Sequence, residues 1–394
     1  MTRRVRRTPS TLLALAALLA GCATVPAPAP PEPGGLVRAE LTGYYPALAL
    51  RLALRLAELP GPTPIRCGVR TWRILYWTGD AGGEVVQASG LYAEPTFCEV
   101  RGLVSYQHGS VSRRDDVPSR GNVEGIAAAA VFAGGGYVTV APDYPGMGAS
   151  TAPHAYLHAA STAASARDLL VAGRALAAQR GHRWPETLLL AGFSQGGHAT
   201  AALQRDLERA PLAGQRLVAA AAGSAPFDLE GVAFPYALAG SSRDHAAYLA
   251  YLAHAYAGRY GEPLDSVLRA PWDDRARALL DGGYDEDDLP RDPRTLFTAS
   301  FLAAHDAGER TWLHRALAEN GTAAWTPRAP LRVYAGSRDE TVPPRDAAAA
   351  VAAMRARGGN AELFDVGPLD HKDAAFAAVP LIRRWFDALV AGEG

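Results

Sequence analysis

The chain has 394 residues, 48% of them hydrophobic and 20% charged, which is enough to bury one large core or two smaller ones. Its formal net charge of −1 at pH 7 gives no electrostatic case for binding nucleic acid. Lys372 is the only lysine, so arginine carries nearly all of the positive charge. These values are typical of an ordinary globular protein.

The first 21 residues have the layout of a signal peptide. A basic start, Met1 to Arg7, precedes an apolar stretch, Leu12 to Ala20, which is too short to span a bilayer. The stretch runs into Leu-Ala-Gly-Cys22, which resembles a bacterial lipobox. The resemblance implies removal of residues 1–21 and diacylation of the Cys22 thiol.

Residues 22–40 are expected to form an extended tether, because prolines crowd the stretch from Pro26 to Pro33. Lipobox and tether together predict an extracytoplasmic protein, held by lipid on the periplasmic or cell-surface face of a bacterial membrane. Two alternatives remain: an ordinary secretory signal with a chance cysteine, and a twin-arginine signal.

The two other cysteines, Cys67 and Cys98, are plausible disulfide partners in an oxidising compartment. Residues 70–78 and 84–94 are predicted to be two strands of a hairpin whose turn, residues 79–83, lies midway between the cysteines. The thiols are therefore expected near each other at the open end of the hairpin. The alternative is two buried free thiols.

Beyond a helix predicted over Pro46–Leu59 and the hairpin, strands and helices alternate. A strand that runs into a polar loop is predicted over 101–110, and further strands over 137–142, 187–191 and 216–223, with helices over 123–132, 161–178 and after residue 197 between them. This alternation is typical of an α/β fold, a mostly parallel sheet covered by helices on both faces. In such sheets the chemistry lies at the carboxyl ends of the strands.

The alternation stops after residue 226. Residues 227–330 carry helical patterns but no convincing strand, and we predict them to be an inserted helical cap. The sheet resumes at 331–335 and 361–366, and a helix over 374–390 closes the chain. The predicted core is therefore 41–226 together with 331–394.

The cap holds 13 of the 32 aromatic residues. Two explanations are open: the large side chains build the cap's own core, or some of them wall an apolar substrate pocket. The candidates for a pocket wall are Tyr248, Tyr251 and Tyr256.

The motif Gly192-Phe193-Ser194-Gln195-Gly196 stands between a predicted strand and a predicted helix. A Gly-x-Ser-x-Gly turn of this kind holds its serine in a strained backbone conformation and exposes the hydroxyl above the sheet. It also points the backbone N–H of Gln195 at the place where a carbonyl oxygen becomes negative. Ser194 is therefore the candidate nucleophile and Gln195 one half of an oxyanion hole.

A serine nucleophile needs a base, and the base needs a carboxylate that fixes its tautomer. In this fold the order along the chain is serine, acid, histidine. The loops after strands 331–335 and 361–366 contain Asp339 and His371, which we predict to be the acid and the base.

Several other polar residues compete for these roles. His198 lies inside the helix after the serine, and Asp143 ends a neighbouring strand, so both are interpreted as structural. Among the other carboxylates Asp228 is the serious alternative acid, while Glu340 and Asp370 are less well placed.

The second oxyanion donor is expected where the strand that ends at Gln107-His108-Gly109-Ser110 passes into its loop. The backbone N–H groups of His108, Gly109 and Ser110 cannot be told apart from the sequence. The ring of His108 is expected to hold the loop.

Taken together, Tyr106-Gln107-His108-Gly109, Asp143 to Gly148, the Ser194 motif, the Asp339 loop and His371 resemble the secretory lipase family of α/β-hydrolases over about residues 65–390. The resemblance implies a carboxylic ester hydrolase whose cap lines an acyl pocket. The amino-terminal lipobox departs from that family.

The leading hypothesis is an esterase or lipase that acts through an acyl-Ser194 intermediate. A serine peptidase or an acyltransferase would use the same residues, and a non-enzymatic surface lipoprotein is the remaining class. No metal-ligand cluster, phosphate-binding loop or dinucleotide fingerprint stands out, so no cofactor and no metal are expected. The expected partners are an ester substrate and, through the anchor, a membrane.

Overall fold

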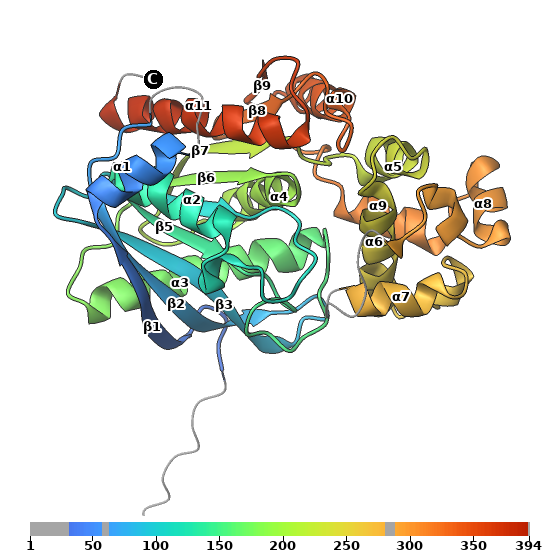
Figure 1. Cartoon of the computed structure of the whole chain (residues 1–394), viewed down its shortest axis with the longest axis horizontal. Coiled ribbons are helices and arrows are strands. Elements are labelled where there is room, and N and C mark those ends of the chain that lie inside the picture. Colours follow the sequence, from blue (N-terminus) through green and yellow to red (C-terminus); the bar gives the residue numbers. More distant parts are fainter. Residues whose placement is uncertain (1–30, 57–62, 280–287, 393–394) are drawn as a thin grey trace, which may run out of the picture. The chain divides into compact units, whose positions relative to one another are not determined.

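The computed structural model describes residues 31–56, 63–279 and 288–392, and a single compact unit begins at Glu32 (Figure 1). The predicted signal peptide and residues 22–30 of the predicted tether, Cys22 among them, therefore lie outside the described residues. No helix within the described ranges is long and apolar enough to cross a membrane.

Within these ranges one nine-stranded sheet has the order β1-β2-β3-β5-β4-β6-β7-β8-β9. The strands span Leu36–Tyr45 (β1), Gly68–Gly79 (β2), Val85–Thr96 (β3), Gly102–Gln107 (β4), Tyr137–Pro142 (β5), Thr187–Phe193 (β6), Arg216–Gly223 (β7), Leu331–Ala335 (β8) and Ala361–Asp365 (β9). The β1, β2, β3 and β5 neighbours pair antiparallel, and all pairs from β5 through β4 to β9 are parallel.

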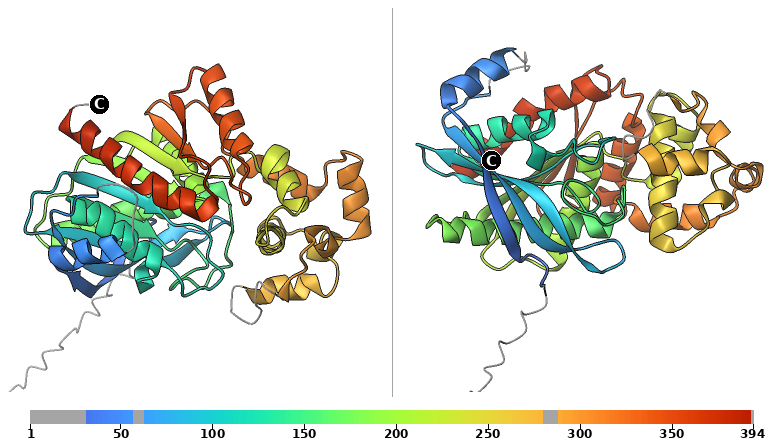
Figure 2. Two further views of the ribbon diagram at one scale, coloured as in Figure 1. Left: turned by 45° about the horizontal axis from the view of Figure 1, so that its top comes forward. Right: turned by 60° about the horizontal axis from the view of Figure 1, so that its bottom comes forward.

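Helices cover both faces of the sheet (Figures 1 and 2). They are α1 (Ala47–Leu56), α2 (Val123–Phe132), α3 (Ala159–Gln179), α4 (Gln195–Arg209), α10 (Pro344–Ala356) and α11 (His371–Ala391). α3, α4 and α10 share one apolar cluster with the sheet, and α1, α2 and α11 share another. Every residue of β4 and β5 is buried, as expected of strands covered on both sides. The predicted α/β fold is confirmed.

β1 corrects the predicted boundary at residue 40. The strand begins at Leu36 and pairs with β2 along its length, so residues 36–40 belong to the sheet and not to the tether. Its side chains are exposed or half-buried throughout, because it is the edge strand. An edge strand of this kind lacks the continuous apolar run that identified the central strands.

The hairpin of β2 and β3 brings Cys67 and Cys98 together. The two residues flank the paired ends of these strands, their Cα atoms are 5.6 Å apart, and the structure joins them as a disulfide. The bond closes the open end of the hairpin, where the sequence placed both thiols.

The residues between β7 and β8 form helices that pack on one another. They are α5 (Phe234–Leu238), α6 (His245–Tyr260), α7 (Trp272–Leu279), α8 (Ala299–Asp306) and α9 (Trp312–Asn320). The apolar cluster that includes Leu249, Tyr256, Phe297 and Leu317 holds these helices together and extends to Tyr156 and Leu157 of the core. We call this part, residues 227–330, the cap. In the described part of the cap the only strand-like pairing is the bridge between Leu268 and Phe297.

Candidate active site

Ser194 stands at a sharp turn between β6 and α4. Its backbone torsions, φ 57° and ψ −123°, lie outside the regions that a residue with a side chain normally adopts. α4 begins at the next residue, so the amino terminus of the helix adjoins the serine. The strain is held because strand and helix on either side are buried.

The glycines of the motif permit this close turn. A Cβ atom at Gly192 would collide with the carbonyl of Gly196, and one at Gly196 would collide with the carbonyl of Gln107 at the end of β4. Any larger residue at either position would push α4 away from β4 and β6.

Asp339, which is buried, and His371, which is half-buried, form a hydrogen-bonded pair. His371 Nδ1 lies 2.7 Å from Asp339 Oδ2, and because a carboxylate oxygen can only accept, the ring donates from Nδ1. Asp339 Oδ1 accepts the backbone N–H groups of Thr341 and Val342, each at 2.9 Å. The Asp339 carboxylate is thereby fixed on both oxygens, and Nε2 of His371 is left as the basic nitrogen of the ring.

The His371 ring packs beside the serine turn. Its centroid lies 5.1 Å from that of Phe193, the residue immediately before Ser194. The loops after β6, β8 and β9 thus bring the predicted nucleophile, acid and base to the same edge of the sheet.

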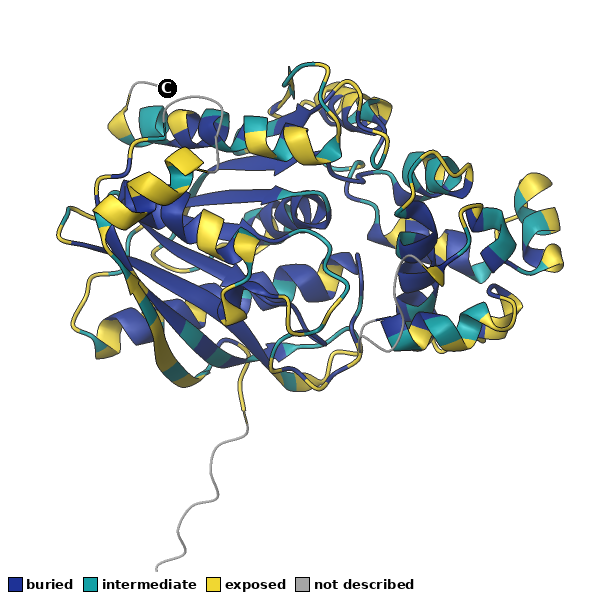
Figure 3. Cartoon of the chain, in the orientation of Figure 1, coloured by how far each residue is buried: buried dark blue, intermediate teal, exposed yellow. Residues whose placement is uncertain are grey.

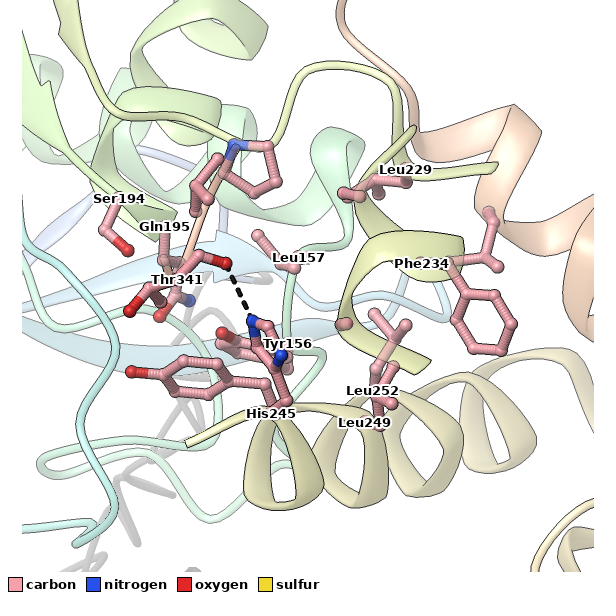
Figure 4. Close-up of a pocket in the computed structure, with 16 residues that line it drawn as sticks. Tyr156, Leu157, Ser194, Gln195, Leu229, Phe234, His245, Leu249, Leu252 and Thr341 are labelled. Carbon is pink, nitrogen blue, oxygen red and sulfur yellow. Dashed lines mark hydrogen bonds between the residues drawn. The ribbon is translucent and has the colours of Figure 1, made fainter. Parts of the chain in front are cut away.

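A narrow apolar cavity of about 60 Å³ runs from Ser194 into the cap (Figure 4). Ser194, Gln195 and Thr341 lie at its core side, and apolar side chains of the cap lie opposite. The cap residues that line it include Leu229, Phe234, Ala237, Tyr248, Leu249, Leu252 and Leu317. Such a cavity suits a hydrocarbon chain rather than a polar group.

A second cavity, of about 250 Å³, is polar. Its lining includes Ser110, Ser112, Asp116, Tyr156, Asp244, Tyr248, Tyr251 and Lys372. Tyr156 and Tyr248 line both cavities, so these two rings separate the polar space from the apolar one. The Tyr156 hydroxyl lies 2.6 Å from Ser110 Oγ in the loop after β4.

The three cap tyrosines singled out in the sequence differ in their positions. Tyr248 lines both cavities, and Tyr251 lines the polar one, where its hydroxyl donates to the carbonyl of Ser112 at 2.9 Å. Tyr256 is buried in the cap's own core, with its hydroxyl bonded to the carbonyl of Leu157 at 3.1 Å. The aromatic residues of the cap therefore serve partly as core and partly as cavity wall.

The loop after β4 corrects one of the candidate oxyanion donors. The backbone N–H of Gly109 donates to both carboxylate oxygens of Glu124, at 3.0 and 3.1 Å, and is therefore engaged. The Tyr106 hydroxyl donates to the same carboxylate at 2.7 Å. Of the three candidate amides, those of His108 and Ser110 remain candidates for the second oxyanion donor. The first candidate donor is the amide of Gln195, the first residue of α4.

The His108 ring holds its loop. Nδ1 lies 2.7 Å from the Gly109 carbonyl oxygen, and the buried ring stacks on Tyr144 at 4.3 Å between centroids. Asp143 is also structural, because its carboxylate accepts from Ser89 at 2.5 Å and from the backbone of Ser119 at 2.9 Å. Burial raises the pKa of Asp143 above its ordinary value.

Of the other residues that compete for these roles, His198, Asp228 and Asp370 have structural partners. His198 is buried, and its Nε2 lies 2.8 Å from the carbonyl oxygen of Asn320 at the end of α9; burial lowers its pKa to about 4. Asp228 accepts from the backbone of Gly231, and Asp370 from that of Asp373. Glu340 is exposed.

Two residues near the site were not found from the sequence. His245, the first residue of α6, is buried in the wall of the apolar cavity, and its Nε2 lies 3.0 Å from the carbonyl oxygen of Thr341 (Figure 4). Glu124, in the first turn of α2, holds Gly109 as described above. Neither contact could be predicted, because no local motif determines how α6 and α2 pack against the loops that they contact.

Comparison with known proteins agrees with this geometry. The sequence model of the family described as secretory lipase matches residues 122–394. The chain belongs to the secretory lipase family. No curated protein sequence matches it.

Solved structures extend the similarity to nearly the whole chain. A putative hydrolase from Legionella pneumophila is 27% identical, with a TM-score of 0.85, over 91% of this chain and 99% of that one. The rice cell wall degrading esterase LipA from Xanthomonas oryzae is 26% identical, with a TM-score of 0.82, over 92% and 100%. Candida antarctica lipase A, at 16% identity and a TM-score of 0.68 over 92% and 83%, shares the fold. The secretory lipase chain is accordingly an ester hydrolase of the α/β-hydrolase type.

Proposed function

We propose that the protein is a serine carboxylesterase in which Ser194, His371 and Asp339 act as nucleophile, base and acid. The observation that carries the proposal is the hydrogen-bonded Asp339–His371 pair beside the strained Ser194 turn, at the mouth of an apolar cavity. No other histidine described near this turn has a carboxylate partner in the same position: His198 and His245 both face backbone carbonyls.

The chemistry follows from these groups. His371 Nε2 takes the proton of the Ser194 hydroxyl as its oxygen attacks the ester carbonyl, and Asp339 stabilises the imidazolium that forms. The N–H of Gln195 and one amide of the loop after β4 stabilise the negative oxygen. His371 then gives its proton to the leaving alcohol, and water, activated by the same ring, releases the acid from Ser194.

The two cavities suggest how an ester lies in the site. Its acyl chain enters the apolar cavity, where burial of each methylene contributes about 0.8 kcal/mol. Its alcohol part faces the polar cavity, whose carboxylates, hydroxyls and Lys372 offer hydrogen bonds. The substrate class that fits is an ester of an apolar acid with a polar alcohol.

Export and lipid anchoring complete the proposal. The lipobox at Cys22 supports an enzyme held at a bacterial membrane, and a disulfide between Cys67 and Cys98 suits an extracytoplasmic compartment. Two acyl chains anchor a protein stably, whereas one chain binds only marginally. Mass spectrometry of the amino-terminal peptide from the membrane fraction, with Cys22→Ser as control, tests this part.

A direct assay tests the activity. Purified protein should hydrolyse p-nitrophenyl esters, and Ser194→Ala should lower kcat by about 10⁴-fold while the fold is retained. A peptide p-nitroanilide tests the peptidase alternative, and added short alcohols test acyl transfer. Full ester turnover by Ser194→Ala would contradict the proposal.

A further inference from the structure

α1 has apolar side chains on two opposite faces. Leu50 is buried in the cluster that α1, α2 and α11 share with the sheet, and Leu54 packs against the same cluster. Leu48, Leu52 and Leu56 are 75%, 59% and 77% exposed. Packing in the core accounts for the face with Leu50 and Leu54, but not for the exposed leucines on the opposite face.

The exposed leucines form one continuous stripe. They follow one another at intervals of four residues, so they lie on the same side of a helix with 3.6 residues per turn. Leu50 is about 200° away from Leu48 around the axis, which places the buried face opposite. Figure 3 shows exposed residues along α1 where it lies on the outside of the core. We call Leu48, Leu52 and Leu56 the leucine stripe.

Positive charge flanks the leucine stripe. Arg51 and Arg55 each precede one of the leucines, and α1 contains no acidic residue. Arg51 Nε donates to the carbonyl of Ile65 at 3.0 Å, which helps fix the helix on the core. Arg55 is exposed and forms no ion pair with any residue that the structure describes. Leucines beside arginines on one helix face match the interfacial region of an anionic bilayer.

The chain length allows this face to reach the membrane at which Cys22 would be anchored. Glu32, where the compact unit begins, lies ten positions after Cys22, and a chain of that length can span roughly 33–36 Å when extended. β1 covers a similar distance, about 33 Å, before Pro46 and α1. A lipid at Cys22 can therefore enter the bilayer beside α1.

We propose that the leucine stripe of α1 docks on the surface of an anionic lipid membrane and orients the enzyme there. The occupant rests on the proposed lipid anchor, since the anchor holds the leucine stripe next to the bilayer and raises its local concentration there. The docking surface itself does not depend on the esterase activity.

Vesicle binding of the acyl-free protein tests the docking surface alone. The chain from residue 22 onward, with Cys22→Ser, is sedimented with phosphatidylcholine vesicles that contain or lack 30% phosphatidylglycerol. We expect binding to the anionic vesicles and a loss of at least tenfold when Leu48, Leu52 and Leu56 are all changed to Ser. Arg55→Gln should weaken binding about fivefold on anionic vesicles and leave neutral ones unaffected.

A matched variant controls for surface hydrophobicity. Val85, Val171 and Leu363 are exposed apolar residues on β3, α3 and β9, and changing all three to Ser should alter vesicle binding less than twofold. Turnover of a water-soluble ester should be the same in all variants that fold; its absence from the parent would contradict the proposed function and leave the binding result valid. Equal vesicle binding by parent and leucine-stripe variant would overturn the inference, as would a parent that binds no vesicles. A variant that loses only dimerisation, measured by sedimentation velocity, would assign the leucine stripe to a second copy instead.

Discussion

His245 Nε2 lies 3.0 Å from the carbonyl oxygen of Thr341, and this contact joins the cap to the loop of Asp339. The backbone N–H of Ser242 donates to His245 Nδ1 at 3.2 Å, so the neutral ring carries its proton on Nε2 and donates it to Thr341. The N–H of Thr341 in turn donates to Asp339 Oδ1 at 2.9 Å. A residue of the cap therefore sets the position of a loop that holds the proposed acid.

Removing the hydrogen bond from His245 to Thr341 should reduce turnover, because the loop that holds Asp339 would be less well fixed. We expect His245→Leu to lower kcat about tenfold with little change in KM, because the carbonyl of Thr341 loses its partner and the loop loosens. His245→Gln retains an N–H near the position of Nε2 and should recover most of kcat. The measurement is steady-state kinetics on p-nitrophenyl butyrate, with His305→Gln, a cap histidine outside the cavity lining, as control. Equal kinetics for His245→Leu and His245→Gln would exclude the positioning role.

Acyl-chain preference should follow the apolar cavity. A cavity of about 60 Å³ admits only a few methylene groups, so kcat/KM should rise about three- to fourfold per added carbon and stop rising at about four to six carbons. Leu252→Ala should move the optimum to longer chains, and Ala237→Leu to shorter ones. Tyr256→Phe, in the cap's core, is the matched control and should leave the profile unchanged. A flat profile from acetate to decanoate would show that the acyl chain binds elsewhere.

His198 should matter for stability and not for chemistry. Its Nε2 bonds Asn320 across 122 residues of sequence, and His198→Ala leaves that buried carbonyl unpaired, at a cost of about 1–3 kcal/mol. kcat should stay within threefold of the parent, while urea denaturation shows the lower free energy of unfolding. Abolished turnover in a fully folded His198→Ala protein would reverse the roles assigned to His198 and His371.

Asp346 should make the free energy of unfolding depend on pH. Burial raises its pKa to about 7; its Oδ1 accepts the N–H of Asp228 at 3.0 Å, and its Oδ2 has no hydrogen-bond partner among the described residues. The folded pKa lies above the unfolded value, so ionisation of Asp346 lowers the free energy of unfolding. This loss reaches its full size above pH 7 and shrinks as the pH falls toward 4. Asp346→Asn should therefore stabilise the protein by up to about 4 kcal/mol at pH 8 and by much less at pH 5.

Urea denaturation of parent and Asp346→Asn at both pH values measures this difference. Glu340→Gln, at an exposed position, is the control and should show no comparable pH dependence. A stabilisation of equal size at pH 5 and pH 8 would mean that Asp346 does not ionise in this range.

The sequence predicts the site best where local chemistry sets the structure. The Ser194 turn follows from glycines within four residues of one another, and Asp339 and His371 follow from their places after strands that can be recognised by apolar runs. The contact of His245 with Thr341 spans 96 residues, and depends on how the cap packs, which no motif encodes. The bond of Glu124 to Gly109 likewise depends on where α2 begins.

The fold shows the same division. Central strands such as β4 and β5 were evident because both faces are buried. β1 was missed because an exposed edge strand has no such pattern. The different places of Tyr248 and Tyr256 could not be predicted either, since helical periodicity does not say which neighbour each face meets.

The most direct test of the proposed function is to trap the acyl-enzyme. Protein mixed with p-nitrophenyl butyrate is quenched in acid within the first turnover, digested and examined by mass spectrometry. We predict a butyryl mass on the peptide that contains Ser194, a matching burst of p-nitrophenol, and neither in Ser194→Ala. A butyryl group on another residue, or the same burst from Ser194→Ala, would contradict this prediction.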